Sequence, residues 1–222
     1  MIYLLDENEL VFPHPSLADE DGLLAVGADL SLDRLILAYE NGIFPWYNED
    51  NPILWYAPLE RFVLPTAKLK VSKSLKQVLK SNKFRVTYDQ DFGAVIRNCA
   101  LMPRKDQDGT WIIADMQQAY IRLHQAGYAH SVEVWQDAEL VGGLYGVQIG
   151  KVFCGESMFS KISNASKVAL YYLANYFGLD LIDCQIPSDH LTKMGAEIIP
   201  QADYLAILQH QQPLAHDFQG TF

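Results

Sequence analysis

The sequence lacks a cysteine motif, a long apolar run and a basic leader. Its three cysteines, Cys99, Cys154 and Cys184, lie far apart and form no Cys-x-x-Cys pair. This spacing indicates neither a disulfide framework nor a zinc site, so free buried thiols are expected. No apolar run approaches the roughly 20 residues that cross a bilayer, and the first residues carry neither a basic region nor a cleavage site. We therefore expect a cytoplasmic protein.

The composition is that of a globular protein. Half of the 222 residues are hydrophobic and 20% are charged, which is unlike the composition of disordered chains. A chain of this length forms one large domain or two modest ones and buries a substantial core.

Charge is distributed unevenly along the chain. The net charge is −10, which by itself disfavours a polyanionic partner. The segment 68–85, however, holds seven basic residues and no acidic one. It predicts a helix that begins after Ser72 and carries an apolar stripe of Leu75, Val78 and Leu79. Four lysines at helical spacing are expected on another face, which suits a phosphate backbone or is simply a solvated surface: Lys73, Lys76, Lys80 and Lys83.

Local signals divide the chain into a small N-terminal domain over residues 1–60 and a second domain over residues 61–222. The N-terminal helix is expected between Ser31 and Gly42. The second domain is expected to be α+β, with a mixed, mainly antiparallel sheet. Its strands are predicted at 84–88, 131–135, 140–147, 151–154, 181–186 and 196–199, and its further helices at 92–100, 115–124 with Asp115 as the cap, 164–177, and through Leu191 and Met194.

This order of elements resembles the acyltransferase fold of the acetyl-coenzyme A-dependent N-acetyltransferases. Fold alone does not determine function. Those enzymes hold the coenzyme pyrophosphate in a glycine-patterned loop that enters the long helix. Residues 155–167 lack that pattern, and Glu156 would repel phosphate. A coenzyme A-dependent enzyme is therefore the second interpretation of the sequence.

Several long motifs make a more specific resemblance. In chain order they include Gly-Ile-Phe-Pro-Trp-Tyr at 42–47, Gly-Thr-Trp-Ile at 109–112, Ala-His-Ser-Val-Glu-Val-Trp at 129–135, Leu-Val-Gly-Gly-Leu-Tyr-Gly at 140–146, Phe-Cys-Gly-Glu-Ser-Met-Phe-Ser at 153–160, Asn-Ala-Ser-Lys at 164–167 and Ile-Asp-Cys-Gln at 182–185. With these motifs the sequence resembles the leucyl/phenylalanyl-tRNA–protein transferase family from residue 22 to about residue 204.

The resemblance implies formation of a peptide bond without ATP, metal or coenzyme. The amino group of an N-terminal Arg or Lys would attack the ester of leucyl- or phenylalanyl-tRNA, and the product would be a degradation signal of the N-degron pathway. A monomer is expected. A third interpretation is a non-catalytic tRNA-binding module that uses only the lysine face.

Asp183 and Gln185 are the expected catalytic pair. Two positions apart in a strand, their side chains are expected on one face. The carboxylate would accept a hydrogen bond from the Gln185 amide, leaving the amide oxygen to draw a proton from the attacking amine. This matches the role that the resemblance implies. The alternative is a pair that caps nearby backbone at the edge of the sheet.

Glu156 is the expected anionic partner of the acceptor's cationic side chain, because carboxylates bind guanidinium and ammonium groups. An apolar pocket and a platform for adenine are also needed, although aromatic and Met side chains are equally common in cores. The candidates are Trp46, Trp111, Tyr120, Leu144, Phe153 and Met158.

Two positions depart from the family pattern. Ser188 replaces an Asn that is common in the family, and Leu144 replaces a common Met, which bears on the preference between leucine and phenylalanine. His130 and His190 have no Ser or Cys partner at motif spacing and are expected to be structural.

Overall fold

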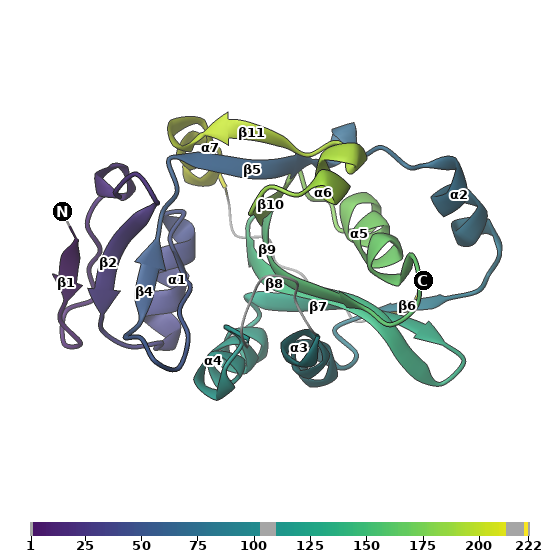
Figure 1. Cartoon of the computed structure of the whole chain (residues 1–222), viewed down its shortest axis with the longest axis horizontal. Helices are drawn as coiled ribbons and strands as arrows, with labels where there is room; N and C mark the ends of the chain where they lie inside the picture. Colours follow the sequence, from purple (N-terminus) through teal and green to yellow (C-terminus); the bar gives the residue numbers. More distant parts are fainter. Residues whose placement is uncertain (1, 103–109, 212–219, 222) are drawn as a thin grey trace.

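The computed structural model describes residues 2–102, 110–211 and 220–221. The N-terminal part is a four-stranded sheet beside one helix (Figure 1). Helix α1 (Leu32–Glu40), expected from the sequence, buries Leu35, Ala38 and Tyr39. The sheet was not predicted, because its strands are only two to five residues long. Its order is β1 (Tyr3–Leu5), β2 (Leu23–Gly27), β4 (Leu54–Tyr56) and β3 (Phe44–Pro45), and the 3-10 helix η1 (Pro15–Leu17) precedes β2.

The rest of the described chain is organised around an eight-stranded mixed sheet. Every neighbouring pair of strands in it is antiparallel except β9 and β10, which are parallel. An antiparallel meander, a long helix and a parallel strand follow in the predicted order, so the α+β fold class is confirmed. The strands, in spatial order, are β11 (Glu197–Pro200), β5 (Glu60–Pro65), β10 (Leu181–Gln185), β9 (Val152–Ser160), β8 (Glu139–Ile149), β7 (Ala129–Gln136), β6 (Arg85–Tyr88) and β12 (Gly220–Thr221).

Helices cover both faces of this sheet and form two cores. Helices α3 (Phe92–Leu101) and α4 (Ala114–Gln125) lie on one face, and α5 (Ala165–Tyr176) lies on the other (Figure 1). The short α6 (Asp189–Met194) follows β10, and α7 (Gln201–Gln209) packs on β5 and β11. Within the described ranges, none of these helices combines the length and apolar character that crossing a membrane requires.

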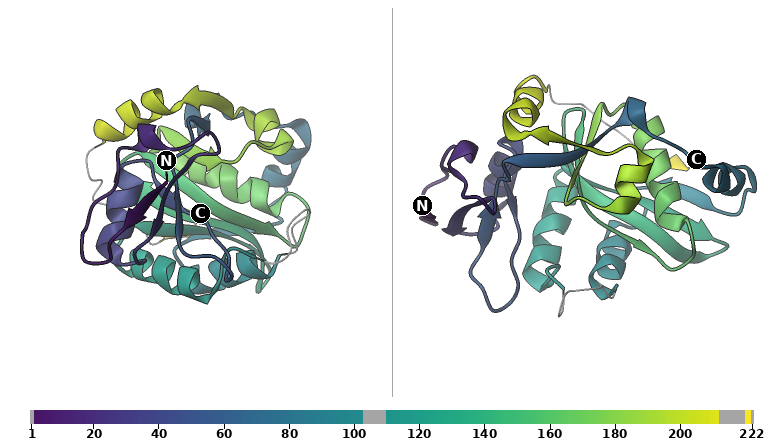
Figure 2. Two further views of the ribbon diagram at one scale, coloured as in Figure 1. Left: turned by 60° about the vertical axis from the view of Figure 1, so that its left-hand side comes forward. Right: turned by 45° about the horizontal axis from the view of Figure 1, so that its top comes forward.

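Helix α2 (Lys73–Lys80) follows the 3-10 helix η2 (Thr66–Lys68) and packs against α5 through Leu75. The predicted cap is confirmed, since the Ser72 hydroxyl accepts a hydrogen bond from the Leu75 N–H at 3.2 Å. The views in Figures 1 and 2 agree that α2 lies at the end of the molecule remote from the N-terminal sheet.

Three local predictions are wrong. Lys83 is not on the lysine helix, because α2 ends at Lys80 and Asn82 turns the chain away with a φ of 50°. Asp115 does not cap α4, which begins one residue earlier, after Ile113. The third strand of the meander continues past Cys154 to Ser160, so Glu156 lies within β9.

The parallel strands β9 and β10 pair over only three residues each, ending at Cys154 and Asp183. Beyond that point each strand is irregular. A bulge interrupts β10 between Asp183 and Gln185, and Gln185 has a φ of 58°. Strand β9 has a register shift opposite Gly146, where a Cβ would lie 2.2 Å from the Cys154 carbonyl oxygen. The two strands therefore diverge at the centre of the sheet.

Candidate active site

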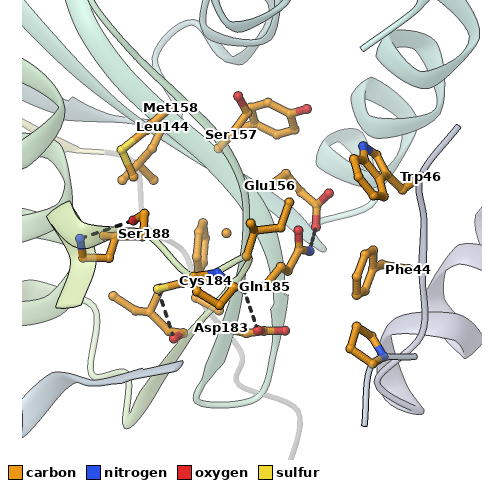
Figure 3. Close-up of a pocket in the computed structure, with 18 of the residues that line it drawn as sticks. Phe44, Trp46, Leu144, Glu156, Ser157, Met158, Asp183, Cys184, Gln185 and Ser188 are labelled. Atoms are coloured by element: carbon orange, nitrogen blue, oxygen red, sulfur yellow. Dashed lines mark hydrogen bonds between the residues drawn. The ribbon is translucent and has the colours of Figure 1, made fainter. Parts of the chain in front are cut away.

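A cavity of about 530 Å³ lies at this divergence. Strands β8, β9 and β10 and helices α5 and α6 form one side, and residues of β3 and β4 in the N-terminal sheet form the other. In the close-up, Phe44 and Trp46 face the cavity from one end, and Leu144 and Met158 lie at the other (Figure 3). Both parts of the chain thus complete one site.

The far end of the cavity is apolar, and its centre is polar. The side chains at the apolar end come from β8, β9, β10 and α5: Leu144, Phe153, Met158, Leu170, Leu173 and Ile182. Glu156, Asp183 and Gln185 supply polar groups between this end and the two aromatic side chains of the N-terminal sheet (Figure 3). The lining fits a ligand with an apolar side chain next to a reactive polar group.

Asp183 is fully buried at the floor of the cavity and forms an ion pair with Arg61 of β5, whose exposure is 2%. Arg61 also donates a hydrogen bond of 2.7 Å to the carbonyl oxygen of Gly42. Its guanidinium lies 4.4 Å from the ring centroid of Tyr204 and 5.1 Å from that of Phe44. The ion pair therefore connects the end of β10 with the turn after α1.

Glu156 is buried, and each of its carboxylate oxygens accepts one hydrogen bond. Tyr120 donates its hydroxyl at 2.9 Å, and Gln185 donates its side-chain amide at 2.9 Å. The Tyr120 hydroxyl is also 2.5 Å from that of Tyr39 in α1. Burial raises the pKa of Glu156 to about 7, although neighbouring hydrogen bonds lower it. Glu156 therefore titrates near neutral pH.

The predicted side-chain hydrogen bond from Gln185 to Asp183 is wrong. The bulge after Asp183 rotates the backbone, so that the Gln185 side chain turns toward β9 and bonds to Glu156. Asp183 instead accepts a hydrogen bond of 3.0 Å from the backbone N–H of Gln185 (Figure 3). The two residues are adjacent as expected, but Asp183 holds the backbone and Glu156 holds the side chain.

The other predicted site residues divide into three groups. Trp46, Trp111, Leu144, Phe153 and Met158 line the cavity. Tyr120 does not line it; it is fully buried behind Glu156. The four lysines are exposed and do not line the cavity; α2 lies on α5.

Sequence reasoning missed Arg61, Tyr39, Phe44 and Tyr204. Arg61 carried one usable signal, since it is a single charge that precedes the apolar run at 62–65 in a buried strand. Such a charge needs an acidic partner. That partner lies 122 positions away in the sequence, so local patterns do not identify it.

One group of described residues has metal-ligand types close together. Ligand atoms of Asp89, His124 and His130 lie within 4.8 Å of one another. Both histidines already use their Nδ1 atoms in hydrogen bonds within the fold, because His130 Nδ1 is 2.7 Å from Asp89 and His124 Nδ1 is 2.8 Å from the Ala129 carbonyl oxygen. The group does not line the cavity. We read it as a hydrogen-bonded support of β7.

Comparisons with known proteins agree on one family. The family model "Leucyl/phenylalanyl-tRNA protein transferase" matches residues 63–209, and the model of its N-terminal domain matches residues 28–59. A leucyl/phenylalanyl-tRNA–protein transferase of Syntrophobacter fumaroxidans is 54% identical over 209 residues, covering 93% of this chain and 89% of that protein. One of Thermodesulfovibrio yellowstonii is 53% identical over 210 residues, covering 93% and 85%.

The crystal structure of FemX is similar with a TM-score of 0.45 and 10% sequence identity, covering 85% of this chain and 75% of that one.

We expect the buried ion pair to be strongly coupled. Arg61→Leu should lower the free energy of unfolding by about 3–5 kcal/mol, because it leaves the Asp183 carboxylate buried without a partner. The double variant Arg61→Leu, Asp183→Leu should lose much less than the sum of the two single variants. Urea unfolding of all four proteins measures the coupling. Additivity within about 0.5 kcal/mol would contradict it.

The raised pKa of Glu156 predicts a pH-dependent stability. The folded protein binds this proton more tightly than the unfolded chain, so the stabilisation is complete below the ordinary value of 4.5 and is lost as pH rises through about 7. Relative to Glu156→Gln, the wild type should therefore lose up to about 3 kcal/mol between pH 4.5 and 8. Urea unfolding across this range is the measurement. Glu60→Gln, at an exposed glutamate, is the control, and parallel curves for wild type and Glu156→Gln would refute the prediction.

Proposed function

The chain belongs to the leucyl/phenylalanyl-tRNA–protein transferase family, and from this premise we propose that it transfers leucine or phenylalanine from aminoacyl-tRNA to the amino terminus of an acceptor protein. One observation carries the proposal: a single cavity joins an apolar end to the hydrogen-bonded pair of Glu156 and Gln185. This arrangement suits an aminoacyl ester whose side chain is apolar and whose carbonyl carbon must meet an amine.

The reaction needs little activation of the nucleophile. The amine nitrogen attacks the ester carbonyl carbon, a C–N bond forms, the C–O bond to the ribose breaks, and the amine proton ends on the ribose hydroxyl. An α-amino group has a pKa of about 7.7–8.0, so its deprotonation at pH 7 costs only about 1–1.4 kcal/mol. The energy of the ester drives the step, and the protein's task is to position the two substrates.

We propose Gln185 as the residue that accepts a hydrogen bond from the attacking amine. Its side-chain nitrogen is held by Glu156 and its backbone N–H by Asp183. The side-chain carbonyl oxygen remains as the acceptor for an N–H of the attacking amine. Asp183 is then a positioning residue, whose charge is neutralised by Arg61.

Other residues that line the cavity suit the amino acid side chain and the terminal adenine of the charged tRNA. The apolar end takes the leucine or phenylalanine side chain, and Leu144 contributes to its shape. Trp46 and Trp111 line the cavity, and an indole is a good surface for stacking of the terminal adenine.

We propose that the acceptor begins with Arg or Lys. Three carboxylates line the cavity, and Arg61 neutralises that of Asp183. The exposed Asp21 remains as a partner for a guanidinium or ammonium group, and Glu156, which already accepts hydrogen bonds from Tyr120 and Gln185, adds negative charge when it is ionised. An acceptor chosen by its first residue fits a role in marking proteins for degradation. Charged tRNA is present in the cytoplasm, so we propose that the reaction occurs there. We also propose that the protein acts as a monomer and that its two domains divide at residue 60.

The proposed function is tested with labelled leucyl-tRNA and three peptides that start with Arg, Lys or citrulline. Citrulline has nearly the shape of Arg without its charge. Label should enter the first two peptides and scarcely the third. Equal labelling of all three would contradict recognition of the charge. Absence of labelling, together with acetylation from acetyl-coenzyme A, would replace the proposal with the coenzyme A-dependent alternative.

Gln185→Ala should lower kcat for transfer by roughly 10²-fold or more, because the acceptor for the amine proton is lost. Glu156→Gln, Gln185→Ala should be little worse than Gln185→Ala, since residues that act as a unit are not additive. The measurement is single-turnover transfer at saturating substrates. A Gln185→Ala protein with wild-type kcat would remove Gln185 from the mechanism.

The lysine face of α2 should bind the tRNA body. Lys76→Ala, Lys80→Ala should weaken binding of charged tRNA and make its salt dependence shallower by about one to two units. The loss should be equal for leucyl- and phenylalanyl-tRNA, because backbone contacts carry no base information. Filter binding across a salt series measures it, with Lys151→Ala as the control at a lysine beside Asp180. An unchanged affinity and slope would leave α2 as a solvated surface.

A further inference from the structure

A second group of positive charges lies at the edge of the cavity, apart from the lysine face of α2. His190 of α6 lines the cavity beside Leu191. Lys193 is one helical turn further along α6, three residues after His190. On α5, Lys167 is one turn before Leu170, which also lines the cavity. Each lysine therefore lies one helical turn from a residue that lines the cavity.

The two lysines form no ion pair with the residues that the structure describes. In the part of the chain that the structure describes, neither Lys167 nor Lys193 lies within ion-pairing distance of a carboxylate. Burial lowers the pKa of His190, and the positive charges of Lys167 and Lys193 lower it further. The buried His190 Nε2 also lacks a hydrogen-bond partner among the described residues. This ring nitrogen of His190 and two lysines that form no ion pair can therefore supply donors to an anion, and Asp189, four residues before Lys193, is the acidic residue on the same helix.

We infer that Lys167, Lys193 and His190 form an anion-binding site that takes a phosphodiester group of the tRNA 3′ end. The inference rests on the proposed function, because it assigns a location to the phosphates that follow the aminoacyl group. The site adjoins the apolar end of the cavity through Leu170 and Leu191, and α5 links it to α2. The tRNA is thus held at two places, its body at α2 and its single-stranded end at this rim.

Binding of two small probes tests the site directly. The trinucleotide CpCpA has two phosphodiesters, and adenosine has none. In Lys167→Gln, Lys193→Gln, binding of CpCpA at low salt should weaken by about tenfold and its salt slope should become shallower by about one unit. Binding of adenosine should change less than about twofold, because adenosine has no phosphate to contact the lysines and independent sites alter affinity by no more than this. The matched control is Lys151→Gln, Lys161→Gln, whose lysines already lie beside Asp180 and Glu139.

A second measurement follows the His190 ring by NMR. Addition of CpCpA to the wild type should raise the pKa of His190, because the anion offsets the lysine charges, and the double variant should show no such rise. Equal loss of CpCpA and adenosine binding in the double variant would overturn the site. Binding of inorganic phosphate as tight as that of CpCpA would also overturn it, because it would indicate a site for free phosphate. Transfer by the wild type with unchanged CpCpA binding in the double variant would overturn the site and leave the proposed function intact. Lysine-dependent CpCpA binding without any transfer would support the anion-binding site and contradict the proposed function.

Discussion

The buried ion pair between Arg61 and Asp183 is the interaction on which the rest of the site depends. A lone carboxylate in this position would cost several kcal/mol, and so would a lone guanidinium. Their pairing lets β10 end in the interior, at the point where it leaves β9. It also attaches the turn after α1 to the larger sheet through the Gly42 carbonyl. Arg61 thus joins the N-terminal part, which forms one wall of the cavity, to the end of β10.

The same carboxylate stabilises an unusual backbone. Gln185 has a φ of 58°, a left-handed conformation that costs about 1 kcal/mol or more outside glycine. Asp183 compensates by accepting the Gln185 N–H, and the turned side chain reaches Glu156. A regular strand would direct Gln185 differently and would close the gap that the cavity occupies. The left-handed backbone at Gln185 and the geometry of the site therefore depend on each other.

The sequence predicted the elements whose signals are local. The hairpin of β7 and β8, the long helix α5 and the Ser72 cap each follow from spacing within a few residues. It did not predict features that depend on distant partners. The polar stretch Gly155-Glu156-Ser157 resembles a loop, yet β8 pairs with it and extends the strand. The bulge at Gln185 is set by contacts with β5 and β9. Asp183 and Gln185 were therefore predicted correctly as neighbours, but the hydrogen bond predicted between their side chains was wrong.

Under the proposed function, charge distribution and not net charge decides how this acidic protein would hold a tRNA and a cationic acceptor. At physiological ionic strength a surface charge acts over about 8 Å, so the total of −10 has little influence on a phosphate that lies next to a lysine. The lysines of α2, α5 and α6 belong to the part of the chain organised around the eight-stranded sheet, whereas Asp21 lines the cavity from the N-terminal part. Under the proposed function, the tRNA would meet these lysines and the acceptor would meet Asp21, with the cavity between the two substrates.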